Sequence, residues 1–324
     1  MPPTDQHSRK AVILAISGAV GCGSIVAVQS RINGELGAEL GDGYVAAFVS
    51  FGSGLVLLLV ATLVAPTGRK ALGSIRDALI SRSIPWWYLL GGTAGAAFVL
   101  AQGISTPLIG VALLTIAAVA GQTVSGLIVD RIGLGTMAST RLTATRIAGS
   151  AIAVGAVVLT VSAQLRLDFP AWALVLPFLA GLALSWQQAA NGQLRGIGGS
   201  AVAASFINFL AGTIVLTVVL FVHAAIAGWP TAFPGNPLLY TGGVLGALLI
   251  AGLSIAVRYT GALLLGLGAL SGQLLASLLL DAFAPVAAHP LTPFTVAGTL
   301  LTLVAVAIAA LPAGSKTTGR TTAR

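Results

Sequence analysis

Long apolar runs, separated by short polar segments, follow one another along the whole chain. A helix needs roughly 20 apolar residues to cross the ~30 Å hydrocarbon core of a bilayer. Runs of about this length cover residues 11–29, 44–65, 86–102, 108–129, 147–163, 171–190, 201–225, 238–257, 261–280 and 296–311. The pattern predicts an all-α integral membrane protein with ten transmembrane helices.

The composition agrees with this pattern and excludes other classes of protein. Of the 324 residues, 56% are hydrophobic and 7% are charged, and the mean hydropathy is +0.99. Soluble domains carry about 25% charged residues, so a soluble enzyme and a disordered chain are excluded. A transmembrane β-barrel is excluded because its strands alternate in hydrophobicity over ~10 residues. The single cysteine, Cys22, cannot form an internal disulfide, and we expect it to be a small buried hydrophobe.

The net charge of +8 does not indicate nucleic-acid binding, because the 16 basic residues are scattered between the apolar runs instead of clustering on one face. If the N-terminus is cytoplasmic, every Lys and Arg except Arg31 and Arg166 falls in a cytoplasmic segment. This bias follows the positive-inside rule. It predicts a multi-pass protein of the cytoplasmic membrane with both termini in the cytoplasm. Residues 313–324 are expected to form a disordered tail.

The two halves of the sequence repeat each other. A shift of 158 positions places segment 29–34 (QSRING) on 187–192 (QQAANG), and segment 46–51 (AAFVSF) on 204–209 (ASFINF). A shift of 151 places segment 91–95 on 242–246 and aligns Gln122 with Gln273 and Asp130 with Asp281. Rare residues that match in order across long ungapped blocks indicate an internal duplication.

The number of helices in each copy determines the topology of the pair. We expect a first repeat at residues 1–166 and a second at 167–312, with five helices each. Because five is odd, the second repeat enters the membrane from the opposite side. Inverted repeats of this kind are typical of secondary transporters, which bind solute between the repeats near the membrane midplane. The sequence therefore predicts transport by alternating access.

The repeated motifs also resemble those of a known family. The pattern Q-x-x-x-N-G-x-L, a Ser/Ala-Phe segment and a later G-Q followed by Asp are similar to the YdcZ-type family of the drug/metabolite transporter superfamily. Residues 271–281 follow the family form G-Q-x-x-x-S-x-x-x-D, whereas the first copy has Gly126 at the serine position and Ser125 one residue earlier. The resemblance implies a ten-helix bundle with a central cavity, in which helices 5 and 10 are peripheral.

Two amide pairs are candidates for solute binding. Gln29 and Asn33 are four residues apart and share a helical face, and Gln187 and Asn191 repeat this spacing. Amide side chains in a membrane face the bundle interior, where they meet polar partners. An alternative for Asn33 and Asn191 is that each Asn-Gly pair ends a helix, since both residue types tolerate the left-handed conformation.

A second group of polar residues lies on the fourth and ninth predicted helices. Gln122, Ser125, Gln273 and Ser277 are candidates to line the solute path, and interhelical hydrogen bonding is the alternative. Asp130 and Asp281 end these helices and are the candidates for proton coupling, although Asp130 is also placed to pair with the adjacent Arg131.

Four glycines in small-xxx-small spacing lie on the third and eighth helices. These are Gly91, Gly95, Gly242 and Gly246. Close helix packing is the usual role of such residues, and a backbone surface open to the substrate is the alternative.

These features favour a secondary transporter, in the direction of export, for small organic solutes or metabolites. A solute channel and a membrane protein without transport activity are the alternatives. The sequence lacks the H-E-x-x-H and G-x-S-x-G motifs, so we expect no enzyme, no cofactor and no metal site. The expected partners are the lipid bilayer and a small-molecule substrate, with the protein a monomer or a homodimer.

Overall fold

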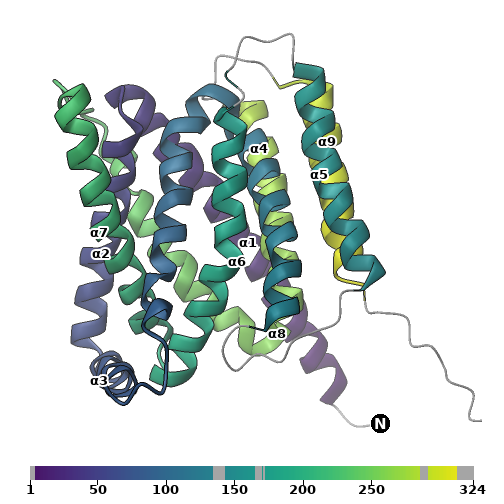
Figure 1. The fold of residues 1–324 in the computed structure, drawn as a ribbon. Coiled ribbons are helices and arrows are strands. Elements are labelled where there is room, and N and C mark those ends of the chain that lie inside the picture. The colour runs from purple at the N-terminus through teal and green to yellow at the C-terminus, as the bar shows by residue number, and fades with distance from the viewer. Residues whose placement is uncertain (1–3, 134–142, 165–169, 171, 285–290, 312–324) are drawn as a thin grey trace, which may run out of the picture.

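The computed structural model describes residues 4–133, 143–164, 170, 172–284 and 291–311, and the side chains of 4–12, 15, 130, 161–164, 251 and 254–264 are left undescribed. The expected disordered tail, 313–324, lies outside this part of the chain. Helices make up the structure (Figure 1). They are α1 (Thr4–Leu40), α2 (Gly43–Val64), α3 (Pro66–Ile80), η1 (Trp86–Gly91), α4 (Gly92–Ile132), α5 (Ala144–Gln164), α6 (Trp172–Gly198), α7 (Ala201–Ala227), η2 (Pro237–Tyr240), α8 (Gly242–Phe283) and α9 (Pro293–Ala309).

Several of these helices have the length and composition of membrane spans. Five segments qualify, and two shorter apolar helices, Ala144–Thr160 and Pro293–Ala309, accompany them. The five are Gly43–Val64, Trp86–Val129, Trp172–Gly198, Ala201–Ala227 and Leu265–Phe283. The described chain is therefore an all-helical membrane protein, as the hydrophobic pattern predicts.

The long helix α4 contains two of the expected helices, joined at Gly110. A straight helix of 41 residues would be ~62 Å long, twice the thickness of the hydrocarbon core. Gly110 instead has φ 81° and ψ 170°, which breaks the helix. The two parts run in opposite directions along α6: Gly91 lies near Asn191 and Gly95 near Gln187, whereas Gly121 lies near Phe178 and Gly126 near Ser185. The chain therefore reverses at a single glycine.

The helix α8 reverses in the same way along α1. Its first part lies antiparallel to α1, and its last part lies parallel to it. In the antiparallel part Gly242 meets Asn33 and Gly252 meets Cys22, and in the parallel part Gly268 meets Ala19 and Gln273 meets Gly23. In both long helices the reversal takes place without a separate connecting loop.

The connections from α1 to α2 and from α6 to α7 are also alike. Gly41 and Gly199 follow the two helices with φ 63° and 67°, a left-handed conformation that glycine adopts without strain. Asp42 and Ser200 come next, and their side chains accept hydrogen bonds from backbone N–H groups of the following helix. These pairs are 158 positions apart, so equivalent parts of the two copies have the same local structure.

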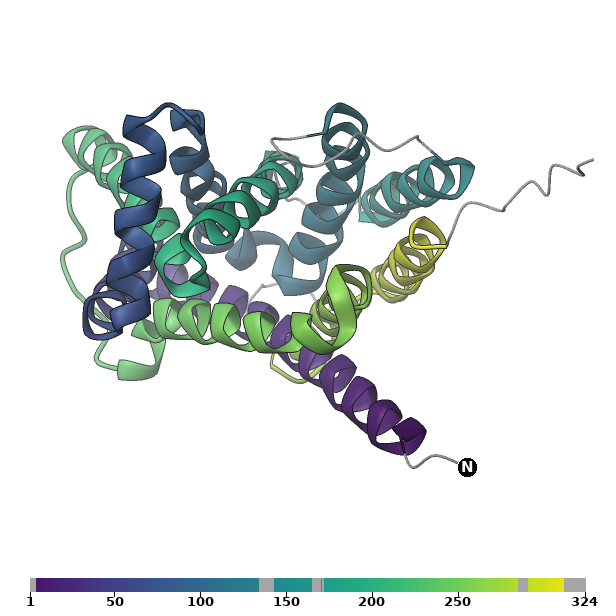
Figure 2. The ribbon, with the colours of Figure 1, turned by 90° about the horizontal axis from the view of Figure 1, so that it is seen from below.

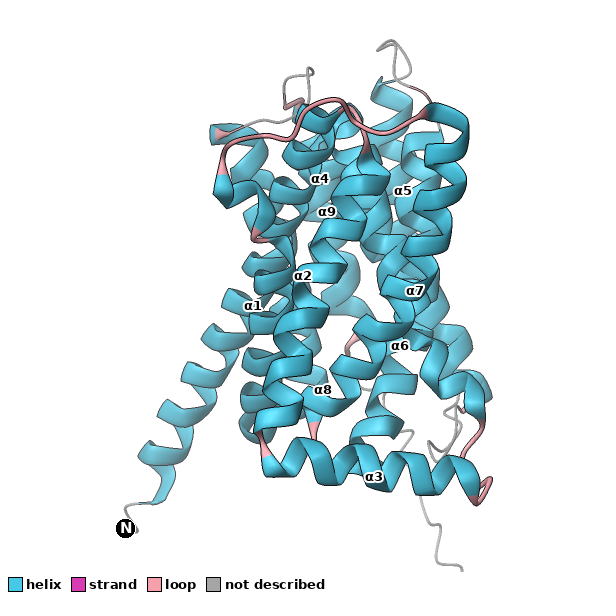
Figure 3. Cartoon of the chain, turned by 90° about the vertical axis from the view of Figure 1, so that its left-hand side faces the viewer, coloured by secondary structure: helices cyan, strands magenta, loops and turns pink. Residues whose placement is uncertain are grey.

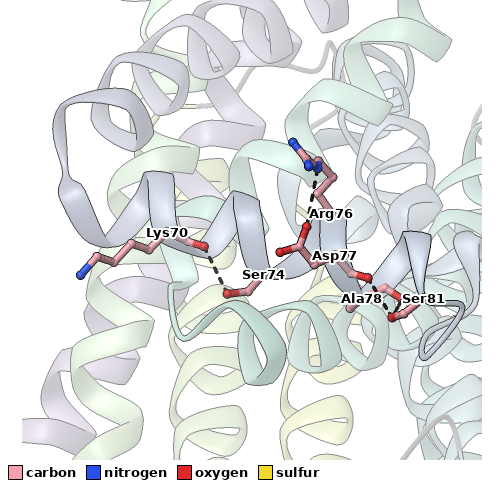
Figure 4. Close-up of polar contacts among 6 residues, drawn as sticks. All are labelled: Lys70, Ser74, Arg76, Asp77, Ala78 and Ser81. Carbon is pink, nitrogen blue, oxygen red and sulfur yellow. Dashed lines mark hydrogen bonds and ion pairs between the residues drawn. The ribbon is translucent and has the colours of Figure 1, made fainter.

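The helix α3 replaces a segment that the sequence pattern treats as a polar loop. It begins with Pro66 at the first turn and lies across one end of the bundle, the end that also holds the start of α1 (Figure 3). Ala71 and Ile75 are buried against the bundle. Its basic residues are exposed. Arg69 donates a hydrogen bond to the Leu63 carbonyl of α2 at 3.2 Å, and Arg76 and Asp77 lie 3.6 Å apart within α3 (Figure 4).

The other long helices form a bundle, and a pair of helices lies at each of its two opposite edges. The helices α2 and α7 lie side by side at one edge, and α5 and α9 lie together at the other (Figures 1 and 2). Between them α1 packs along α8, and α4 packs along α6. The peripheral place of α5 and α9 agrees with what the family resemblance implies for the fifth and tenth helices.

Candidate functional site

The helices α2 and α7 cross where two equivalent phenylalanines meet. The rings of Phe51 and Phe209 stack with centroids 4.7 Å apart and an interplanar angle of 23°. Gly54 lies against the ring of Phe209, and Gly212 lies against the ring of Phe51. All these positions are related by the shift of 158, so the contact joins the two copies symmetrically.

Close to this crossing, the first amide pair closes against α8. Gln29 Nε2 donates to the carbonyl of Gly242 at 2.9 Å, and the head group of Asn33 covers the same glycine. The side chains of Gln29 and Asn33 are 7% and 0% exposed. Since α1 continues to Leu40, Asn33 lies well inside a helix. The interpretation that this Asn-Gly pair ends a helix is wrong, because the helix continues to Leu40.

The orientation of the Asn33 amide follows from a hydrogen-bond chain. The Ser30 hydroxyl donates to the Val26 carbonyl at 2.9 Å and accepts from Gln102 Nε2 at 2.9 Å. Gln102 Oε1 then accepts from Asn33 Nδ2 at 2.7 Å. An amide has one acceptor end and one donor end, so Asn33 Oδ1 must point away from this hydrogen-bond chain, and it has no hydrogen-bond partner among the described residues. Sequence reasoning missed Gln102, because it ends an apolar run and has no counterpart in the second copy.

The second amide pair lies against the first part of α4 in the equivalent place. Gln187 Nε2 is 2.7 Å from the position that a Cβ atom would take on Gly95, and Asn191 Oδ1 is 3.6 Å from that of Gly91. Asn191 also lies inside its helix, which continues to Gly198, so it does not end the helix either. Each Gln–Asn pair therefore packs on a glycine pair of the other repeat.

This second pair lacks the hydrogen bonds of the first. Within the described chain the Gln187 amide makes no hydrogen bond, and Asn191 Oδ1 is buried without a partner. Both residues are half-buried. The two amide pairs thus differ in their hydrogen bonds, since Gln29 bonds to α8 and Gln187 bonds to no described residue of α4.

Two further polar side chains flank the glycine pairs. Ser50 and Asn208 are 2% and 5% exposed, and neither Ser50 Oγ nor Asn208 Oδ1 has a hydrogen-bond partner in the part of the chain that the structure describes. Ser50 lies beside Gly242, and Asn208 lies beside Gly92. They were not among the predicted site residues, although the repeat aligns them 158 positions apart inside apolar runs, which is the signal that identifies them.

The polar residues of the later parts of α4 and α8 have mixed environments. The hydroxyl of Ser277 donates to the Leu274 carbonyl at 2.9 Å, so its donor is used within its own helix. Ser125 donates to the Gln122 carbonyl at 3.4 Å. The amide groups of Gln122 and Gln273 make no hydrogen bond to the described residues, and Gln273 is 8% exposed.

The carboxylate of Asp281 has a structural task. It accepts hydrogen bonds from the N–H groups of Val111 at 3.0 Å and Ala112 at 2.7 Å, which begin the second part of α4. A carboxylate at a helix N-terminus interacts favourably with the free N–H groups and the helix dipole. A Cβ atom on Gly110 would collide with this carboxylate. The side chain of Asp130, its counterpart, lies outside the described residues.

Comparison with known proteins gives the fold and the family. One solved structure, titled "Crystal structure of protein", is 18% identical, covers 93% of this chain and 96% of its own, and has a TM-score of 0.52, so the two share a fold. No match was found among proteins with curated descriptions. The family described as "Putative inner membrane exporter, YdcZ" matches residues 14–159 and 172–308, once for each repeat. The chain therefore belongs to the YdcZ family of the drug/metabolite transporter superfamily, a family of membrane transporters.

Proposed function

We propose that the protein is a secondary transporter that exports small organic solutes across the cytoplasmic membrane by alternating access. Its ten transmembrane helices form two inverted five-helix halves, residues 1–166 and 167–312, with both termini in the cytoplasm. In this proposal the helices α4 and α8 each count as two spans, because each reverses direction within its length. The family membership supports a membrane transporter, and the geometry between the halves supports the mechanism.

One observation carries the proposal. Each half contributes a Gln–Asn pair that packs on two glycines of the other half. In a bilayer an unpaired polar group is costly, so such groups mark the bundle interior and the solute path. The unpaired oxygens of Asn33, Asn191, Ser50 and Asn208 are all at this inter-half contact. Groups of this kind exchange hydrogen bonds with a solute as the halves move.

The charges favour a solute without a strong charge. The acidic residues lie at helix ends, on α3 or in connecting segments, so the middle of the bundle offers amides and hydroxyls. An amide cannot take up and release a proton near neutral pH. Coupling to a proton gradient, where it exists, falls to Asp130 and Asp281 at the helix ends.

Counterflow in proteoliposomes tests this function. Liposomes that hold the purified protein and an unlabelled solute mixture should accumulate a labelled member of the mixture transiently and saturably, because one carrier site exchanges the two pools. The variant Gln187→Leu should lose this exchange, and Gln188→Leu should keep it, since the exposed Gln188 follows directly on the same helix. Ohmic single-channel current in place of saturable exchange would favour a channel.

A further inference from the structure

We propose that the two Gln–Asn pairs are gates that close in turn, and that the open gate binds an uncharged solute through its N–H or O–H groups. In this structure the Gln29–Asn33 gate is closed and the Gln187–Asn191 gate is open. The inference rests on the proposed function, because it names the gates and the solute class of the same inter-half site.

In the closed gate both amide nitrogens donate hydrogen bonds. Gln29 is bonded to the Gly242 carbonyl, and Asn33 is fixed by Gln102. Directly after Asn33 on α1, Gly34 packs on Thr106 of α4. Asp281 bridges the two halves at the same end through Val111 and Ala112. Four independent contacts thus hold this end of the bundle together.

The open gate lacks the equivalent contacts. Gln187 rests on Gly95 just as Gln29 rests near Gly246, but it does not bond to the Gly91 carbonyl. Gly192, the counterpart of Gly34, is exposed, and the side chain of Val257, the counterpart of Thr106, lies outside the described residues. The Gln and Asn residues and the glycines that they pack on are the same in the two gates, so we assign this difference in contacts to closure.

The repeat indicates what happens at the other extreme of the cycle. When two halves of similar structure exchange conformations, each contact of one gate passes to the equivalent residues of the other. Gln187 Nε2 then donates to the Gly91 carbonyl, and Gln29 releases the Gly242 carbonyl. The stacked rings of Phe51 and Phe209 are related to each other by the same shift, so this contact persists in both states and serves as the pivot.

The open gate presents acceptors to a solute. Asn191 Oδ1 and Asn208 Oδ1 are both unpaired and buried. A solute with N–H or O–H groups satisfies these oxygens, and the free Gln187 amide adds a donor and an acceptor. A cation is disfavoured, because the described part of this gate holds no carboxylate and Arg195 lies one turn further along α6. An anion would have to pair with that arginine, which gives the test a separate arm.

The rate of thiol labelling at position 192 reports the state of the open gate. The reporter is Gly192→Cys in a Cys22→Ser background, and the purified full chain is treated with a polar maleimide. Gln29→Met removes a hydrogen bond of the present state, so labelling should slow about threefold, equivalent to ~0.6 kcal/mol for a membrane hydrogen bond. Gln187→Met removes a hydrogen bond of the opposite state, so labelling should become faster, by up to the same factor.

The control Gln188→Met, next to the gate residue and exposed, should leave the rate unchanged. Effects of Gln29→Met and Gln187→Met in the same direction, or an unchanged rate in Gln29→Met, would overturn the gates. Gel filtration and melting curves of each variant identify any that fail to fold, in which case Gln29→Asn, which keeps an amide but shortens its reach, replaces it. Opposite shifts without any counterflow would leave the gates standing and reject transport.

Four matched probes test the solute class through protection of the same thiol. Benzamide has N–H donors and no charge, N,N-dimethylbenzamide has no donor, benzoate is an anion, and benzylamine is a cation. Protection by benzamide alone, lost in Asn208→Leu, is the expected result. Protection by benzoate alone would assign the site to anions, and protection by N,N-dimethylbenzamide or by no probe would reject binding through donor groups.

Discussion

The Asp281 carboxylate offers the sharpest test of how the two halves are held together. We predict that Asp281→Ala destabilises the protein, because it removes the partner of two backbone N–H groups, those of Val111 and Ala112, at 3.0 and 2.7 Å. Leaving a half-buried donor unsatisfied costs about 1–3 kcal/mol, and loss of a helix cap alone costs about 0.5–2 kcal/mol. Since water reaches part of this site, we expect a total of about 2–4 kcal/mol.

Melting of the purified protein in detergent measures this effect. In proteins of 150–250 residues, 1 kcal/mol shifts the Tm by about 2–4 °C, so a fall of about 4 °C or more is expected here. Asp281→Asn keeps an acceptor oxygen and should fall by less than half as much. The control is Asp77→Ala, which removes an exposed carboxylate on α3 and should shift the Tm by less than 1 °C. A normal Tm for Asp281→Ala would refute the role of Asp281 as a cap for α4.

Three further predictions concern transport and packing. Replacing Gln122 or Gln273 by Leu should abolish or reshape transport while insertion stays normal, because Leu favours the bilayer; normal transport by both variants, measured in proteoliposomes, would assign these amides to packing. Uphill transport driven by a pH gradient should disappear in the double variant Asp130→Asn, Asp281→Asn, and its survival would exclude coupling at the helix ends. Ile75→Asp should detach α3 from the bundle and lower the Tm, since it buries a charge among apolar side chains. Limited proteolysis should then cut α3 faster than in the unchanged protein, and an equal rate would contradict the detachment.

The sequence predicts the helices well where the physical signal is local. Apolar runs of bilayer length give the spans, and the repeat identifies Gln29, Asn33, Gln187 and Asn191 as related residues. The reversal at Gly110 is harder to place, because the turn takes a single residue and its N–H groups are satisfied by Asp281, 170 positions away. The sequence pattern places the break between its third and fourth runs at residues 103–107, and the turn itself lies three residues later.

The interhelical partners could not be predicted from local patterns. The amphipathic helix α3 is short and charged, so it reads as a loop until its contacts with α6 are seen. The glycine pairs belong to close packing in general, but only the fold shows that they receive the amides of the opposite repeat. Gln102 lacks a repeated counterpart, and its role depends on the approach of α4 to α1.

The side of the membrane on which equivalent positions lie tests the central claim, that the two halves are inverted. Ala38 and Gly196 are equivalent residues, 158 positions apart, near the ends of α1 and α6, and both are exposed. Single cysteines at these two positions, in a Cys22→Ser background, can be labelled in intact cells with a membrane-impermeant maleimide. The account predicts that Ala38→Cys reacts from outside and that Gly196→Cys reacts only after the cells are opened. Reaction of both cysteines from the same side would contradict the inverted arrangement.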